Sequence, residues 1–233
     1  LAVSPATRSA LVRLGADPAR VVVVEPGVDL DDLDAAAGSP ATVRARHAGS
    51  ALVGYLGNLD AYQGLDLVLR AVAAMRRDGI PTELLVVSES DPGATAREAA
   101  RRGIAVRFER HGALSRALGA LSACDVAVVG RNVRGGFPVK LAVLLAAGIP
   151  AAATPAAVEG LGIDDVVWTA GDGSAEALGR AAAAAVRDGV ERAARVERGL
   201  RLASDRWSAA AAAGRLEEGL RSAVEMRGPV RTL

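Results

Sequence analysis

The stretch from Asp125 to Thr154 constrains the fold of this chain most strongly. It begins with a β-branched run, Val126 to Val129, passes through a glycine-containing loop that ends at Gly136, and finishes with a second apolar run, Ile149 to Ala153. Residues 137–148 between them have the composition of a helix that is apolar on most sides. A strand, a turn, a helix and a strand in this order predict a parallel β-α-β crossover. Its turn lies at the carboxyl end of a strand, where ligands bind in open parallel sheets.

Lys140 is the unusual residue of the predicted helix, because every other residue from Val139 to Ala147 is apolar. Pro138 suits the start of this helix and Gly148 suits its end. A cation in the first turn faces the positive end of the helix dipole, which is unfavourable unless an anion is present. A glycine-led helix start with free N–H groups and a lysine therefore indicates a phosphate pocket. The alternative is a lysine whose ammonium group extends past apolar neighbours into solvent.

Composition and charge exclude several classes of protein. With 233 residues, 51% of them apolar, the chain can form one large α/β domain or one domain with a helical tail. A net charge of +1 gives no sign of a nucleic-acid partner. The single cysteine, Cys124, excludes an internal disulfide and suits a reducing compartment, so we expect a cytoplasmic protein. No apolar run reaches the roughly 18 residues of a membrane span. Because the sequence begins within an element and without methionine, we expect a fragment or a processed piece of a longer protein.

Apolar periodicity predicts strands that alternate with helices along the chain. The predicted strands are 21–24, 52–56, 83–87, 105–108, 126–129, 149–153 and 166–169. The predicted helices are 4–14, 42–47, 65–75, 95–102, 113–122 and 138–147, followed by a helical stretch from 174 to 224 with a break at Asp205-Arg206-Trp207. This alternation predicts an α/β fold, a Rossmann-like doubly wound parallel sheet with C-terminal helices.

Four segments, in order and over nearly the whole chain, resemble the family 4 (group 1) glycosyltransferases. They are Val3-Ser-Pro with Gly15 to Asp29, the strand–loop–helix from Val53 to Ala71, the unit from Cys124 to Pro150, and the C-terminal helices that contain Trp207. Such enzymes have the two-domain GT-B fold, and the resemblance implies that this chain is the C-terminal, donor-binding domain. It implies a lead-in helix and strand over 1–30, a Rossmann-like nucleotide-sugar-binding domain over 31–190, and helices over 191–233 that pack back toward a missing N-terminal domain.

The resemblance implies hexosyltransferase-like transfer of a sugar from a nucleoside-diphosphate sugar to an acceptor, without a metal or another cofactor. The diphosphate leaving group must then be neutralised by helix N-termini, backbone N–H groups and basic side chains. The implied donor-binding residues are Gly57, Asn58, Gln63, Arg131, Gly135, Gly136, Phe137, Pro138 and Lys140. No catalytic residue is assigned, because the missing domain would supply the acceptor site, the base and any membrane contact.

Three of the candidate positions have ordinary alternatives. Gly57, which would let a phosphate approach the backbone, also suits a simple turn at a strand end. Arg131 could add positive charge to the pocket or be a surface arginine. The resemblance places His111 where such domains hold the nucleobase, and the alternative is a solvent-exposed loop histidine.

The sequence departs from the family at its charged positions. The common Glu-x7-Glu pair reads Gly135 and Val143, and the Arg and Lys of the first glycine loop read Asn58 and Gln63. A branch with a Tyr-Gln-Gly loop and a Gly-Phe-Pro-x-Lys-Leu helix start fits better, and in that branch Lys140 is the main cation. The departures keep open a non-catalytic GT-B-like binding or assembly domain with a degenerate donor site. A third reading, a sugar-nucleotide epimerase of the same fold, needs carboxylates and histidines that the sequence does not place.

Overall fold

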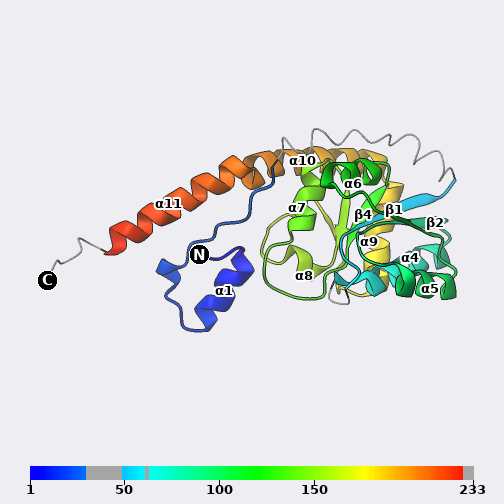
Figure 1. Cartoon of the computed structure of the whole chain (residues 1–233), viewed down its shortest axis with the longest axis horizontal. Coiled ribbons are helices and arrows are strands. Elements are labelled where there is room, and N and C mark those ends of the chain that lie inside the picture. Colours follow the sequence, from blue (N-terminus) through cyan, green and yellow to red (C-terminus); the bar gives the residue numbers. More distant parts are fainter. Residues whose placement is uncertain (30–48, 61–62, 228–233) are drawn as a thin grey trace.

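The centre of the molecule is a parallel sheet (Figure 1). It has six strands in the order β3-β2-β1-β4-β5-β6. The computed structural model describes residues 1–29, 49–60 and 63–227. The strands are β1 (Ala51–Leu56), β2 (Thr82–Val87), β3 (Val106–Glu109), β4 (Val126–Val129), β5 (Ala151–Ala153) and β6 (Trp168–Thr169). This order is that of a Rossmann-like doubly wound sheet, so the predicted α/β fold is confirmed.

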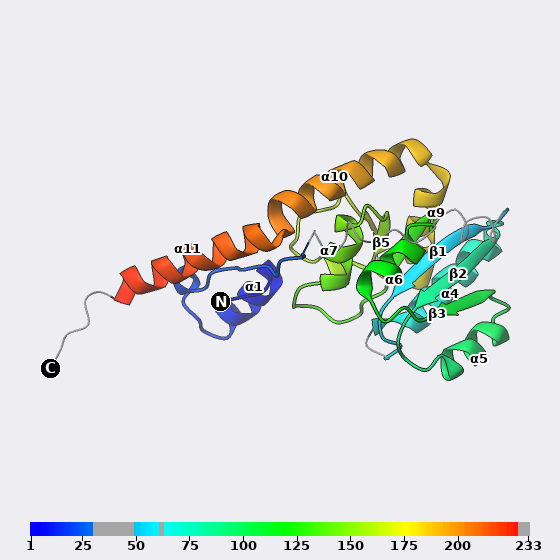
Figure 2. The same cartoon turned by 45° about the horizontal axis from the view of Figure 1, so that its top comes forward.

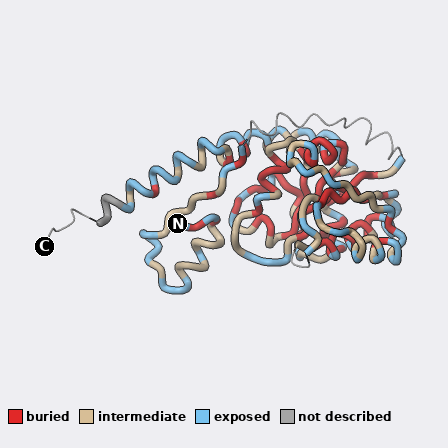
Figure 3. Tube along the Cα trace, viewed as in Figure 1, coloured by how far each residue is buried: buried red, intermediate tan, exposed pale blue. Residues whose placement is uncertain are grey.

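Helices cover both faces of the sheet. One face carries α4 (Leu65–Arg77), α5 (Gly93–Arg101) and α9 (Ala175–Arg187), and the other carries α6 (Leu114–Leu121), α7 (Val139–Ala146), α8 (Pro155–Val158) and the end of α10 (Gly189–Trp207). Alternate strand residues enter the two apolar clusters, as Leu52 and Val53 do. Strands buried on both faces appear in the sequence as continuous apolar runs, which is why most of them were predictable. Figure 3 shows this buried core along the trace.

The N-terminal segment lies beside the last helix, α11 (Ala209–Arg227), as both views of the chain show (Figures 1 and 2). It contains α1 (Pro5–Arg13) and a short 3-10 helix, η1 (Pro18–Arg20). Gly219 of α11 packs against Val22, whose Cγ1 would lie 3.1 Å from an added Cβ. Glu25 is only 3% exposed and accepts hydrogen bonds from Arg206 Nε (2.7 Å), Arg206 Nη2 (2.6 Å) and Trp207 Nε1 (2.9 Å). This carboxylate therefore ties the N-terminal segment to the end of α10.

The prediction of a strand at 21–24 is wrong. Val23 forms only an isolated parallel bridge with Ala2, and Val28 forms another with Ser208. A β-branched run needs a neighbouring strand of similar length to form a ladder, and here each contact is limited to a single residue pair.

The C-terminal helical stretch is divided twice instead of once. The predicted break at Trp207 is present between α10 and α11. A second break falls at Asp188, whose backbone is extended (φ −107°, ψ 91°) and whose side chain accepts a hydrogen bond from the N–H of Glu191. The predicted helix 42–47 lies outside the described residues, and α8 was not predicted. Among the described helices, none combines the length and hydropathy of a membrane-spanning segment.

Candidate donor-binding site

A cavity of about 580 Å³ lies at the carboxyl ends of β1 and β4, against the start of α7. The chain runs outward from β1 toward β3 and from β4 toward β6, so β1 and β4 form the topological switch point of the sheet. Ligands of doubly wound folds bind at this point. The residues that line the cavity are Tyr55, Leu56, Gln63, Val128, Val129, Gly130, Arg131, Val133, Phe137, Pro138, Val139, Lys140 and Leu144.

Lys140 is the charged centre of this cavity. Its Nζ donates a hydrogen bond to Gln63 Oε1 at 2.6 Å and lies 5.5 Å from the centroid of the Tyr55 ring, within cation–π range. Burial lowers the pKa of this ammonium group to about 8, and the nearby charge of Asp60 partly opposes the shift. The ammonium group is thus partly desolvated and faces no carboxylate at hydrogen-bonding distance among the described residues. Such a group gains from an anionic ligand.

Lys140 is also the only lysine in the chain, since the remaining 27 of its 28 basic residues are arginines. The structure gives a steric reason for glycine at the neighbouring position 57. Gly57, with φ +127°, lies directly beside Nζ, and a Cβ at Gly57 would overlap the ammonium group. Glycine at position 57 therefore leaves the space that the ammonium group occupies.

A close backbone contact holds the loop after β1 against the end of β4. Gly64, with φ +74°, precedes α4, and an added Cβ would lie 2.5 Å from the carbonyl carbon of Gly130. A Cβ added at Gly130 would in turn lie 2.8 Å from the carbonyl oxygen of Gly64. Because these atoms belong to the main chain, only glycine fits on either side. The contact places Gln63 beside Lys140.

The loop 131–136 forms one wall of the cavity and is folded on itself. The Arg131 guanidinium donates to the carbonyl oxygen of Gly135, and the Arg131 carbonyl accepts from Thr154 Oγ1 at 2.5 Å. Gly135 and Gly136 have φ values of +82° and +69°, which glycine adopts without strain. The Gly136 N–H donates to Thr7 Oγ1 of α1 at 3.1 Å. This loop is therefore fixed from the sheet on one side and from α1 on the other.

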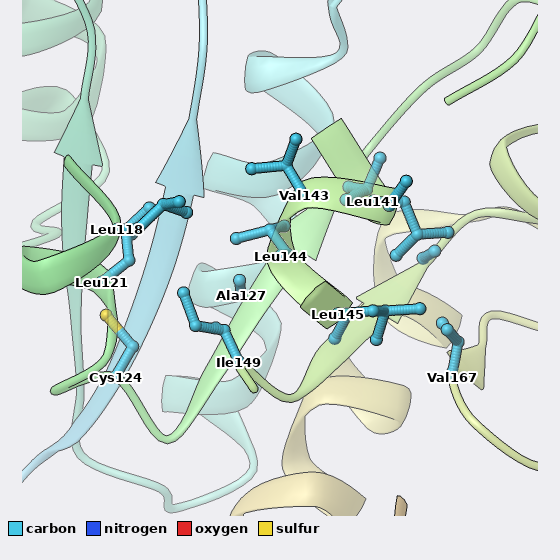
Figure 4. Packing of buried hydrophobic residues seen from close by; sticks show 14 of the residues in the cluster. Leu118, Leu121, Cys124, Ala127, Leu141, Val143, Leu144, Leu145, Ile149 and Val167 are labelled. Carbon is cyan, nitrogen blue, oxygen red and sulfur yellow. The ribbon is translucent and has the colours of Figure 1, made fainter. Parts of the chain in front are cut away.

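The start of α7 differs in detail from the prediction. Pro138, with φ −83° and ψ 74°, precedes the helix, so that Val139 is its first residue and Lys140 its second. Phe137 packs edge-on against Trp207, with ring centroids 5.4 Å apart. Val143 is 6% exposed and lies in the apolar cluster between α7 and the sheet (Figure 4). It brings no polar group to the cavity.

The structure brings together some of the sequence-predicted residues and separates others. Gln63, Arg131, Phe137, Pro138 and Lys140 line the main cavity. A smaller cavity of about 190 Å³ at the ends of β1 and β2 contains Gly57 and Asn58, and a third cavity of about 550 Å³, against α1, contains Gly135. Gly136 is engaged by Thr7.

The loops beside the smaller cavity also hold His111. Its ring Nε2 hydrogen-bonds to Glu109 at 2.7 Å, and its backbone N–H donates to Glu89. The hydrogen bonds from the N–H groups of Gly112 and His111 lower the pKa of Glu89. His111 is thus held by Glu109 at the end of β3 and by Glu89 in the loop after β2. No group of three or more potential metal ligands is found within the described residues.

Two residues of the site were not identified from the sequence. Tyr55 lines the cavity, and its hydroxyl donates to Asn58 O at 2.6 Å, which fixes the loop after β1. Thr7 contacts the 131–136 loop from 129 positions away in the sequence. The position of Tyr55 near the end of a predicted strand was a usable signal, whereas no local pattern indicates Thr7.

Comparison with known proteins agrees with this architecture. The family model of group 1 glycosyl transferases matches residues 50–188, and no curated protein matches the sequence. Anabaena HepE in complex with UDP and glucose superposes with a TM-score of 0.75 at 17% identity, over 95% of this chain and 62% of that one. A glycosyltransferase from Rickettsia africae gives 0.77 at 16% identity, again over 95% and 62%. Trehalose 6-phosphate synthase from Burkholderia multivorans gives 0.75 at 16% identity, over 99% and 60%.

At these identities the structural likenesses show a shared fold. This chain spans about 62% of the first two of these structures. The family model covers more than half of the chain, including β1, the switch point and α7. The chain belongs to the group 1 glycosyl transferases.

Proposed function

We propose that this chain is the C-terminal, donor-binding half of a family 4 glycosyltransferase and binds the nucleoside diphosphate of its sugar donor at the switch-point cavity. The observation that carries the proposal is the ammonium group of Lys140, held beside Gln63 in that cavity. It is supported by the structures of Anabaena HepE with UDP and with UDP-glucose, which share the fold. The reaction we propose is hexosyl transfer that uses no metal and is completed by an N-terminal GT-B domain.

The geometry suggests how the leaving group is stabilised. As the bond between sugar and diphosphate breaks, negative charge develops on the diphosphate, and a cation fixed in advance lowers the energy of that state. Lys140 supplies this charge at the start of α7, where the helix dipole also favours an anion. Arg131 lies on the same wall, with its guanidinium on Gly135 O. The valines and Leu144 provide an apolar surface for the uncharged part of the ligand.

The donor ribose is held differently from the family pattern in this proposal. None of the described residues that line the main cavity carries a carboxylate, and Val143 is buried in the core. The ribose hydroxyls therefore have no acidic acceptor there. The same observation favours the second candidate, a non-catalytic binding or assembly domain that retains the fold.

The remaining parts of the proposal concern the whole protein. We propose a cytoplasmic protein, on the basis of the single buried thiol of Cys124. We divide the chain into a lead-in (1–30), the nucleotide-sugar-binding domain (31–190) and closing helices (191–233) that pack toward the N-terminal domain. Any membrane contact would be made by that other domain.

Calorimetric titration with UDP, GDP, ADP and dTDP tests the donor site. We expect one of them to bind, and Lys140→Met to weaken that binding by at least about tenfold, since hydrogen bonds to charged groups contribute about 1.5–3 kcal/mol. Arg180→Met, which removes an exposed cation from α9, is the matched control and should bind as the unmodified chain does. Binding that is unaffected by Lys140→Met would reject the site, and no binding at millimolar concentration would favour the non-catalytic candidate.

A further inference from the structure

Thr7 joins α1 to the loop that walls the donor cavity, although the two are 129 positions apart in the sequence. The hydroxyl of Thr7 lies 3.1 Å from the N–H of Gly136 and 3.0 Å from Ser4 Oγ. Since the Gly136 N–H can only donate, Thr7 Oγ1 accepts this bond and its own proton is available for Ser4 Oγ. The result is a short polar chain from the loop into the first turn of α1.

The hydroxyl of Thr7 is not needed to form α1. Ser4 is the N-cap of this helix, and its Oγ accepts from the backbone N–H of Thr7 at 3.1 Å. The cap is thus made by the Ser4 side chain and the Thr7 main chain, a combination that any residue except proline retains at position 7. Apart from its hydrogen bond with Ser4 Oγ, Thr7 Oγ1 makes one contact outside its own helix, the one with Gly136.

The start of α1 is held firmly enough to act as a support. Ser4 is fully buried, and Ala2 pairs with Val23. An added Cβ at Gly160 would lie 3.3 Å from Pro5 Cβ, so the first turn packs directly on the residues that follow α8. Thr7 therefore projects from a packed helix end.

The loop that Thr7 contacts contributes directly to the cavity. An added Cβ at Gly136 would lie 3.1 Å from Arg131 Nη2, so Gly136 is enclosed between the Arg131 guanidinium and Thr7. The next residues, Phe137 and Pro138, line the cavity and lead into Lys140. A shift at Gly136 would pass along this short covalent path to the cation.

We infer that Thr7 is a positioning residue of the donor site: its hydroxyl holds the Gly135–Gly136 turn and thereby sets Phe137 and Lys140 for the diphosphate. The effect of Thr7 on nucleotide binding rests on the proposed function, whereas its effect on the loop does not. The contact between Thr7 and Gly136 makes the donor site dependent on the N-terminal segment, so that a movement of α1 loosens the Gly135–Gly136 turn.

Hydrogen exchange of the chain without ligand tests the structural half of the inference. The variants are Thr7→Val, which keeps the shape and removes the hydroxyl, Thr7→Ser, which keeps the hydroxyl, and Ser9→Ala, which removes an exposed hydroxyl from the same helix. We expect peptides that cover 131–138 to exchange about fivefold faster in Thr7→Val, the effect of one net hydrogen bond, and at the original rate in the other two. Equal rates in Thr7→Val and the unmodified chain would overturn the inference, as would fast exchange in Thr7→Ser.

Nucleotide titration of the same variants tests the functional half. Thr7→Val should weaken binding of the nucleotide that the unmodified chain prefers by about threefold to tenfold, and Thr7→Ser should restore it. Unchanged affinity in Thr7→Val would reject a role in positioning the donor site. If the unmodified chain binds no nucleotide, the proposed function fails, while the exchange rates still decide whether Thr7 holds the turn.

Discussion

Replacing Gly64 by alanine tests the closest approach of two backbones in the site. Gly64 has φ +74°, and an added methyl group would lie 2.5 Å from the carbonyl carbon of Gly130. Gly79, just beyond the other end of α4, is a matched control, because its φ is +78° and nothing lies within 4 Å of an added methyl group. An L-residue at such a positive φ costs about 1–2 kcal/mol. Gly79→Ala should carry this strain alone.

Gly64→Ala adds an overlap that no side-chain rotation can relieve, since the atoms it meets in Gly130 are main chain. Extra atoms in a packed site typically cost a further 1–3 kcal/mol or so. We therefore expect losses in unfolding free energy of about 2–5 kcal/mol for Gly64→Ala and about 1–2 kcal/mol for Gly79→Ala. Urea unfolding followed by circular dichroism measures both. Equal losses in the two variants would refute the proposed contact between the loop after β1 and the end of β4.

Three further predictions concern charge and the ligand. Burial lowers the pKa of Lys140 to about 8, so nucleotide affinity should fall as the pH rises through 8. The unfolding free energy should rise between pH 8 and 10.5, because the unfolded chain binds more protons than the folded chain in this range. Both effects should vanish in Lys140→Met. Glu25→Ala should lower the unfolding free energy by about 3 kcal/mol in urea titrations, because it leaves Arg206 and Trp207 Nε1 without their acceptor, and Glu25→Gln should cost less. If the chain binds UDP, the affinity for 2′-deoxy-UDP measured by calorimetry should be within about threefold of that for UDP. A carboxylate that held the 2′-hydroxyl would make the affinity for 2′-deoxy-UDP at least about tenfold weaker.

Much of the fold was predictable because its strands are buried on both faces. Val126 to Val129 is an uninterrupted apolar run that ends at Gly130, and Leu52 to Leu56 is an apolar run that is broken only by Gly54 and ends at Gly57. This pattern leaves few alternatives to a parallel sheet. The same pattern was misleading at Val21–Val24, where the residues are suitable for a strand but only a single bridge forms. Strand formation depends on a partner that the local sequence does not contain.

The helix break at Asp188 could have been predicted from the sequence. An Asp followed three residues later by Glu191 is a helix-start pattern, and the structure shows the corresponding side-chain cap. The run of alanines before it concealed the break, since alanine favours helix on both sides.

The parts of the site that lie within one segment were predictable from the sequence, and the parts formed by contacts between distant segments were not. Lys140 was identified because a cation interrupts an apolar helix start, and that reasoning is local. The contacts of Thr7 with Gly136, of Gly64 with Gly130 and of Glu25 with Arg206 join segments between 66 and 181 positions apart in the sequence, and no periodicity or spacing encodes them.

The pKa of Lys140, measured with and without a nucleoside diphosphate, tests the central claim most directly. Because the chain has one lysine, labelling lysine Cε with ¹³C gives a single side-chain NMR signal, whose shift can be followed against pH. The structure predicts a pKa of about 8 in the free chain, because the ammonium group is partly desolvated, and a rise toward the ordinary value of 10.5 when a diphosphate binds beside it. A pKa near 10.5 in the free chain, or one that stays at 8 while nucleotide is bound, would contradict a donor site built around this lysine.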